Sequence, residues 1–374
     1  MRRDVVIAGA AAVPGVRRPG PAVSTQALLA RAFELALESA RIAPGDVDGL
    51  GVSSFSLRPD RAVDLAWQLG IRARWVMDDV VGLSLLAHAV RAVEAGDAKT
   101  IVLVGGDRLV GAEFADLATN LNRTARDYLS PLPTGGPNAL FALVTRAHMR
   151  VHGLSREAYG RVVLAQRAWA ARNPAAVYRD TLTMDEYLAA PAVADPLGRY
   201  DCVPLVAGAE AVVVAARAVD APVAVRAVET IFNHDHQEGD GLETGLGAVA
   251  PRLWERAGIA PADVDVAAVY DDYPVTVLAQ LHELGLTREP HAAALLDGQQ
   301  DGARPAVNTS GGMLNAGQAG GAGTLHGLVE CVRQLRGERG EGQVPGARTA
   351  VVSTVTLAIY RYGACAAAAV LERA

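Results

Sequence analysis

Residues 40–48 read Ala-Arg-Ile-Ala-Pro-Gly-Asp-Val-Asp, and residues 257–265 read Ala-Gly-Ile-Ala-Pro-Ala-Asp-Val-Asp. Each copy ends a stretch with helical periodicity, turns at a proline and enters a short apolar run that is typical of a buried strand. The recurrence of one helix, turn and strand unit indicates a chain built from two equivalent halves.

The similarity continues downstream of both copies. Each half is expected to contain a strand, a glycine-containing turn, a helix and a second strand. The first strand, the helix and the second strand are expected at 75–79, 88–94 and 100–105 in the first half and at 305–308, 324–335 and 349–353 in the second. This order predicts an α/β fold with right-handed crossovers. Reactive groups of such sheets lie beyond the carboxyl ends of strands, so the loops 78–84 and 308–324 are the expected places for chemistry.

The repeat also predicts the domain organisation. We expect an N-terminal half over 1–218 and a C-terminal half over 219–374. Between about 110 and 205, short helical patterns are interrupted by prolines and have no counterpart in the second half, so this segment is predicted to cap the first half.

Composition limits the classes of function that the chain can have. The 374 residues carry a net charge of −6, which gives no basic field for a nucleic acid. Three scattered cysteines form no disulfide or zinc pattern and favour a reducing cytoplasm. Apolar runs are too short to span a membrane. His234 and His236 form a weak metal candidate, with a solvated loop as the alternative, so no metal is expected in this chain.

The glycine-rich loop carries a family resemblance. Residues 308–317, Asn-Thr-Ser-Gly-Gly-Met-Leu-Asn-Ala-Gly, resemble the Asn-x-x-Gly-Gly segment of thiolases, closest to the sterol-carrier-protein type. Residues 269–273 and 277–285 are similar to the second active-site segment of that branch. Further matches lie at 173–174, 195–202, 208–211, 333–337 and 343–344. The resemblance spans nearly the whole chain and implies a duplicated five-layer αβαβα fold.

The residues that define thiolase chemistry are replaced. Aligning Gly82 with the glycine after the thiolase nucleophile places Asp79 in the position of the acylated cysteine, and a shift of one residue gives Val80. Gln318 replaces the histidine of the Gly-His-Pro motif, and Tyr270 replaces the His or Asn of the second segment. Claisen exchange needs a thiolate and a histidine that activates it, so ordinary thiolysis by this chain alone is not expected.

Other groups remain for acyl-thioester chemistry. The backbone N–H groups of Gly311, Gly312, Gly317 and Gly321 are candidates for polarising a thioester carbonyl, together with the Gln318 amide. Tyr270 and Asp271 are candidates for proton transfer. The alternatives are a tight connection for the glycines and ordinary packing for the tyrosine.

The C-terminal loop supplies a further pair of tyrosines. Tyr360 and Tyr362 lie two residues apart and would share one face of an extended segment, which points toward the cleft if the segment continues a strand. Core or interface packing is the alternative for both.

The resemblance implies a function and partners. Cysteine-less members of this branch include retro-aldol lyases that cleave β-hydroxyacyl-CoA thioesters and work with a zinc-containing OB-fold protein, and thiolase-type sheets pair into homodimers. We therefore expect a coenzyme A thioester as substrate and an aldol-type lyase reaction. The alternatives are an inactive pseudo-thiolase subunit that binds an acyl carrier or partner enzyme, and a Claisen-type acyltransferase component.

Overall fold

The computed structural model describes residues 5–57, 61–109, 111–120, 123, 125–129, 131–132, 136–216, 222–356 and 364–374. Tyr360, Tyr362 and the predicted boundary between residues 218 and 219 lie outside these ranges. The boundary therefore stays a prediction.

The strands form two halves with the same internal order. The first half contains β1 (Val5–Val16), β2 (Gly49–Ser53), β3 (Trp75–Asp78), β4 (Thr100–Arg108) and β7 (Ala207–Ala216), in the spatial order β3-β2-β4-β7-β1. The second contains β8 (Val223–Phe232), β9 (Val266–Val269), β10 (Ala306–Val307), β11 (Thr349–Thr356) and β12 (Cys365–Arg373), in the order β10-β9-β11-β12-β8. A short antiparallel pairing between β1 and β8 joins the two sheets.

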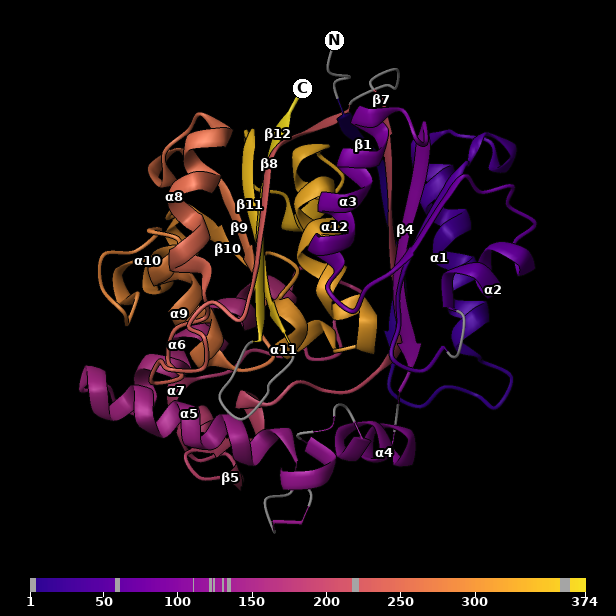
Figure 1. Cartoon of the computed structure of the whole chain (residues 1–374). Coiled ribbons are helices and arrows are strands. Elements are labelled where there is room, and N and C mark those ends of the chain that lie inside the picture. Colours follow the sequence, from indigo (N-terminus) through magenta and orange to yellow (C-terminus); the bar gives the residue numbers. More distant parts are fainter. Residues whose placement is uncertain are drawn as a thin grey trace.

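Helices complete five layers, as the resemblance implied. In Figure 1, α3 (Gly82–Ala95) and α12 (Gly323–Leu335) lie between the two sheets. The helices α1 (Thr25–Ala40) and α2 (Arg61–Gln68) cover the outer face of the first sheet, and α8 (Leu246–Ala257) and α9 (Pro274–Glu283) cover that of the second.

The repeated nonapeptide explains how each half is assembled. Its final aspartate makes equivalent hydrogen bonds in both copies. Asp48 accepts the N–H groups of Lys99 and Thr100 at 2.8 and 2.9 Å, where β4 begins. Asp265 accepts the N–H groups of Arg348 and Thr349 at 2.7 and 3.1 Å, where β11 begins. Each aspartate thus satisfies backbone donors and fixes the start of the neighbouring parallel strand.

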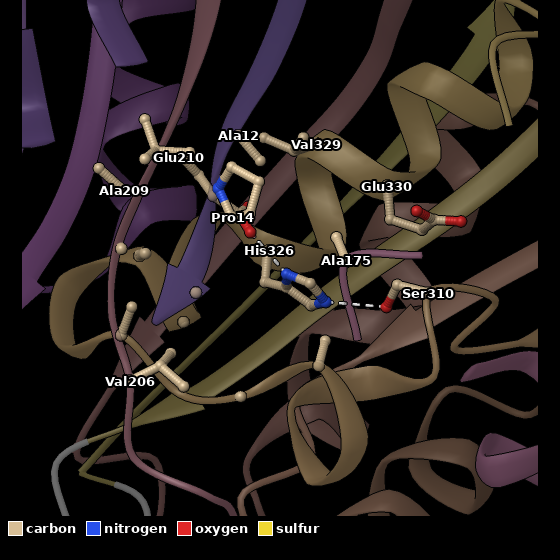
Figure 2. A pocket seen from close by; sticks show the side chains of 18 of the residues that line it. Ala12, Pro14, Ala175, Val206, Ala209, Glu210, Ser310, His326, Val329 and Glu330 are labelled. Carbon is tan, nitrogen blue, oxygen red and sulfur yellow. Dashed lines mark hydrogen bonds and ion pairs between the residues drawn. The ribbon is translucent and has the colours of Figure 1, made fainter. Parts of the chain in front are cut away.

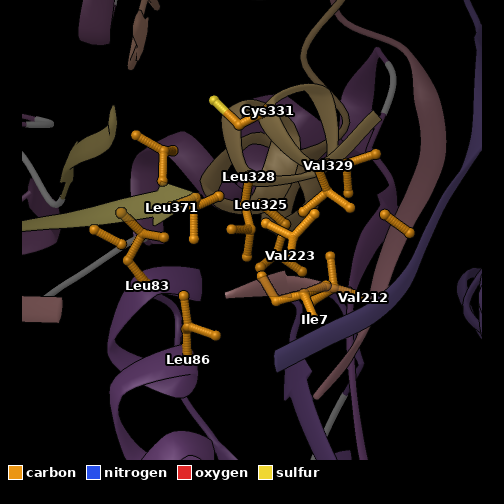
Figure 3. Close-up of a cluster of buried hydrophobic side chains, with 14 of the residues drawn as sticks. Ile7, Leu83, Leu86, Val212, Val223, Leu325, Leu328, Val329, Cys331 and Leu371 are labelled. Atoms are coloured by element: carbon orange, nitrogen blue, oxygen red, sulfur yellow. The ribbon is translucent and has the colours of Figure 1, made fainter. Parts of the chain in front are cut away.

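The central layer carries much of the apolar core. Figure 3 shows Leu83 and Leu86 of α3 packed near Leu325 and Leu328 of α12, with strand side chains from both sheets around them. All four leucines are fully buried. Removing one would leave a cavity and cost about 2–5 kcal/mol, so this contact holds the two halves together.

The segment between β4 and β7 forms a layer at one end of both sheets. It contains α4 (Ala112–Asn120), α5 (Pro137–His152), α6 (Arg156–Ala170), α7 (Met184–Leu188), β5 (Ala192–Ala194) and β6 (Leu197–Gly198). In the described part of the second half, the additional α-helices are the short α10 (Ala293–Asp297) and α11 (Gly312–Ala316).

Candidate active site

Three polar side chains meet where β9 ends and the glycine-rich loop passes. The Tyr270 hydroxyl donates to Asp272 Oδ2 at 2.8 Å, and Gln318 Nε2 donates to the Tyr270 oxygen at 3.3 Å and to Asp272 Oδ1 at 3.4 Å. Tyr270 and Gln318, predicted separately, therefore belong to one cluster. Its carboxylate comes from Asp272, which the sequence reasoning missed.

Gln280 on α9 fixes the backbone of Tyr270. Its Oε1 accepts the Tyr270 N–H at 3.2 Å, and its Nε2 donates to the Tyr270 carbonyl at 2.6 Å. Ser353 of β11 also donates to Gln280 Oε1, at 2.9 Å. Because Gln280 is fully buried, these bonds are shielded from water and hold Tyr270 in one orientation.

The cluster opens into an apolar cavity of about 230 Å³. Its walls include side chains of α4 and α5, among them Phe114, Leu117 and Phe141. The Phe141 ring stacks on Tyr273 with centroids 4.2 Å apart, and Tyr273 donates to Asn138 Oδ1 at 2.7 Å. The capping segment thus closes the cavity against the residues that follow β9. An apolar wall with a few convergent polar groups is the usual character of a small-molecule site.

Burial sets the protonation of the cluster. It raises the pKa of Asp272 to about 6, although the hydrogen bonds from Tyr270 and Gln318 oppose this rise. Burial and the neighbouring Asp272 carboxylate raise the pKa of Tyr270 well above 10. At neutral pH the cavity therefore holds a protonated phenol that donates to a carboxylate, which is an arrangement suited to proton transfer.

Asp271 points away from this cavity. It is buried and accepts the N–H groups of Met313 and Leu314 in α11 at 2.9 and 3.2 Å. Burial raises its pKa to about 7. The carboxylate that the sequence analysis paired with Tyr270 therefore anchors the neighbouring loop, and Asp272 occupies the expected place.

Four glycines were candidates for polarising a thioester carbonyl, and in the structure the N–H group of each is hydrogen-bonded within the protein. The acceptors are the Asn308 carbonyl for Gly311, Ser310 Oγ for Gly312, the Met313 carbonyl for Gly317 and Asp107 Oδ2 for Gly321. None of the four lines the large cavity, whereas Gly320 does. Their bonds fit the alternative of a tight connection.

Asp79 lies in its own loop. Its Oδ1 accepts the Val81 N–H at 2.9 Å, and the residue is not among those that line the large cavity. The start of α3 nevertheless lies close to the site, because Gly82 donates to Thr324 Oγ1 at 3.0 Å and Thr324 lines the cavity.

One cysteine, Cys202, also lines the cavity. Burial and the nearby Asp201 raise the pKa of its thiol to about 12. A thiol in this state is not a thiolate at neutral pH and lacks the reactivity of an acyl-accepting nucleophile.

The sequence analysis also considered a metal site at His234 and His236 and the presence of membrane spans. His234 and His236 lie in the turn after β8 rather than on a strand. In the described part of the chain, no group of three or more His, Cys, Asp or Glu side chains is arranged to hold a metal ion. Among the described helices, none combines the length and apolar character needed to cross a bilayer.

Comparisons with known proteins agree with this architecture. The thiolase C-terminal domain-like family matches residues 229–372. A 17-hydroxy-3-oxo-4-pregnene-20-carboxyl-CoA lyase of Mycobacterium tuberculosis is 31% identical over 338 residues, covering 83% of this chain and 86% of that protein. A steroid side-chain-cleaving aldolase of Thermomonospora curvata is 27% identical over 364 residues, covering 89% and 92%.

A solved structure described as an Ltp2-ChsH2(DUF35) aldolase superposes with a TM-score of 0.82 at 24% identity, covering 99% of this chain and 98% of that one. The chain therefore belongs to the thiolase superfamily, in its sterol-carrier-protein-type branch. Its Asp78–Ser84 loop has no cysteine.

Proposed function

We propose that this chain is a lyase that cleaves a carbon–carbon bond of a β-hydroxyacyl-CoA by a retro-aldol reaction. The observation that carries the proposal is the hydrogen-bonded cluster of Tyr270, Asp272 and Gln318 at an apolar cavity. The cluster supplies acid–base groups and an amide donor, and the cavity supplies no thiolate. Such a set suits proton transfer rather than acyl transfer through cysteine.

In the proposed reaction the cluster takes up one proton from the substrate and later returns one. Tyr270 takes the proton of the substrate β-hydroxyl while passing its own proton to Asp272. The bond between Cα and Cβ then breaks, Cβ becomes a ketone carbon, and the electron pair moves into the thioester as an enolate. Return of the proton to Cα releases the shortened acyl-CoA, so that atoms and charge balance without another reagent.

In this scheme Gln318 polarises the thioester carbonyl. Its Nε2 already lies 3.3 Å from the Tyr270 oxygen, so a carbonyl near Tyr270 is within reach of the amide. A neutral donor that faces developing negative charge lowers the barrier to the enolate.

The size and lining of the cavity favour a bulky apolar acyl group. Phe114, Leu117 and Phe141 offer flat and branched apolar surface, which suits a fused-ring carbon skeleton. The relatives named as a pregnene-carboxyl-CoA lyase and a steroid side-chain-cleaving aldolase support the same substrate class. The compound 17-hydroxy-3-oxo-4-pregnene-20-carboxyl-CoA is therefore the first substrate to test.

The test compares two tyrosine variants with this compound, using chain co-purified with any partner. Tyr270→Phe is expected to lower kcat by about 100-fold or more, which is typical for loss of a proton-transfer group. Tyr159→Phe is the matched control, because its hydroxyl bonds to His148 and does not line the large cavity. Ketone formation is measured by mass spectrometry. Unchanged turnover in Tyr270→Phe would remove this residue from the mechanism.

We further propose that the chain forms a homodimer through the β3 edge and also binds an OB-fold partner that contains zinc. Among the described strands, β3 pairs with β2 alone, and Val76 on β3 is 41% exposed. On α2, Val63 and Trp67 are 61% and 82% exposed, one helical turn apart. An unpaired edge beside large exposed apolar side chains is typical of a subunit interface. The structure described as an Ltp2-ChsH2(DUF35) aldolase supports a second component.

A further inference from the structure

The first turn of α11 is held by two acidic or hydroxyl side chains. Asp271 accepts the Met313 and Leu314 N–H groups, and Ser310 Oγ accepts the Gly312 N–H at 3.1 Å. Helix α11 is only five residues long and leads directly to Gly317 and Gln318. The Gln318 backbone is held on one side by hydrogen bonds with Pro204 and Val206, at 2.9 and 3.0 Å, and on the other side it follows this single turn.

The His326 imidazole lies within hydrogen-bond distance of both Ser310 and Glu210. Figure 2 shows His326 of α12 with Ser310 on one side. His326 Nε2 lies 2.8 Å from Ser310 Oγ, and Nδ1 lies 2.6 Å from Glu210 Oε1. Glu210 belongs to β7 of the first half, whereas His326 and Ser310 belong to the second. These contacts thus connect the two halves beneath α11.

The imidazole is positively charged at neutral pH. Burial has the largest single effect and lowers the pKa of His326. The ion pair and hydrogen bond with Glu210 and the charges of Asp271 and Glu330 together outweigh it and raise the pKa to about 9. Both ring nitrogens then donate, one to Glu210 and one to Ser310.

The other charges around His326 are largely paired. Glu330 is bound by Arg339 at 2.8 Å, and Arg333 and Arg339 line the cavity beside the imidazole. Asp271, Ser310, Gly312 and His326 line one small cavity. Besides Glu210, Asp271 is thus a buried carboxylate close to His326, and in the described residues it accepts the Met313 and Leu314 N–H groups.

The order Ser310, His326, Glu210 also occurs in hydrolases with a serine nucleophile, but the surroundings here oppose that chemistry. Ser310 is only 3% exposed, and its oxygen already accepts the Gly312 N–H. The next N–H groups, from Met313 and Leu314, are taken by Asp271, so they are not available to stabilise an oxyanion. A protonated imidazole cannot accept the serine proton either.

We propose that His326, held by Glu210, is a positioning residue that holds Ser310 in place beside Asp271, so that α11 presents Gln318 to Tyr270 and Asp272. The proposal rests on the proposed function only for the task of Gln318. An ionised carboxylate binds backbone N–H groups more strongly than a neutral acid, so loss of the imidazolium charge loosens the first turn of α11.

The test follows hydrogen exchange of the peptide 308–318 across pH, after correction for intrinsic exchange rates. In the unaltered chain, protection of α11 is expected to fall as the pH drops through about 7, where Asp271 takes up a proton. In His326→Gln, the midpoint is expected to rise by about one pH unit, because an opposite charge near a carboxylate normally lowers its pKa by about that much or more. His88→Gln is the matched control, because His88 is exposed on α3.

A second variant keeps the proposal testable if His326→Gln does not fold. Glu210→Gln keeps the imidazole but removes the charge that holds its proton, so the same midpoint is expected to rise by a smaller amount. NMR of the histidine ring nitrogens is expected to show His326 protonated at pH 8 in the unaltered chain. A neutral His326 at that pH, or an unmoved midpoint in a folded variant, would overturn the proposal. Neither readout requires turnover, so failure of the proposed lyase reaction is recognised separately.

Discussion

At the scale of single residues, the site depends on the pairing of Tyr270 with Asp272. A free tyrosine is too weak an acid to lose its proton at neutral pH, and burial makes ionisation harder still. The adjacent carboxylate compensates, because it accepts the phenol proton over a bond of 2.8 Å. The ionised state of Asp272 is therefore the state that can receive a proton from the substrate through Tyr270.

This pairing predicts the pH dependence of catalysis. Protonation of Asp271 near pH 7 is expected to lower kcat/KM first, because it loosens α11 and with it Gln318. Since only the carboxylate form of Asp272 accepts a proton, kcat/KM is expected to fall further as the pH drops through about 6. Asp272→Asn is expected to lose most activity together with this acid limb. A pH profile of kcat/KM checks both, and a limb near pH 6 that persists in Asp272→Asn would assign it to another group.

The sequence analysis proposed Tyr270 and Gln318, which the structure brings together, but it proposed Asp271 rather than Asp272 as the carboxylate. Tyr270 and Asp272 lie two residues apart just after β9 and both line the cavity, while Asp271 between them bonds to α11. Side-chain alternation continued past the end of the strand would have pointed to Asp272. The thiolase resemblance directed attention to Asp271 because it directly follows the residue in the motif position.

At the scale of elements, the glycines of the 308–324 loop allow other groups to approach closely. A Cβ on Gly312, where φ is +62°, would lie 2.0 Å from Asp271 Oδ2, and a Cβ on Gly321 would lie 2.1 Å from the Ser53 carbonyl oxygen. Asp107, which binds the Gly321 N–H, also accepts the Phe55 and Ser56 N–H groups. The glycine pattern could be read from the sequence, but the groups that approach it are far away in the chain.

Gly321→Ala is therefore expected to destabilise the fold. The new methyl group would collide with backbone, which cannot rotate away, so we expect a loss of about 1–3 kcal/mol or more in the free energy of unfolding. Gly45→Ala is the matched control, because no atom lies within 4 Å of the added Cβ. Urea unfolding followed by circular dichroism measures both. Equal stability of the two variants would mean that the loop is not packed against Ser53.

At the scale of the whole molecule, the repeat predicted the architecture because each half must bury its own sheet with the same helix and turn. The strands at 49–53 and 266–269 and the helices ending at Ala40 and Ala257 lie where the nonapeptide placed them. The cavity was not predicted, because its walls come from α4 and α5 in a segment without a second copy. Periodicity identifies helices there but carries no information on where they dock.

Assembly is the second property at this scale. If the β3 edge forms the homodimer, Trp67→Glu combined with Val76→Glu is expected to yield monomers, since like charges from both subunits would be buried without a partner at the interface. Val151→Lys introduces a charge at another exposed apolar position, on α5, and is expected to leave the dimer intact. Sedimentation velocity distinguishes these outcomes. A dimer that survives the double change would place the interface elsewhere.

The most direct test of the account is the reaction of the unaltered chain, with any co-purified partner, with 17-hydroxy-3-oxo-4-pregnene-20-carboxyl-CoA in the absence of free coenzyme A. We expect equal amounts of 17-ketone and shortened acyl-CoA, with no change in the intact mass of the protein, because the proposed cleavage needs no acyl-enzyme. An acyl adduct on Cys202 or Asp79, or a strict requirement for free coenzyme A, would contradict the retro-aldol reaction and restore a thiolase-type one.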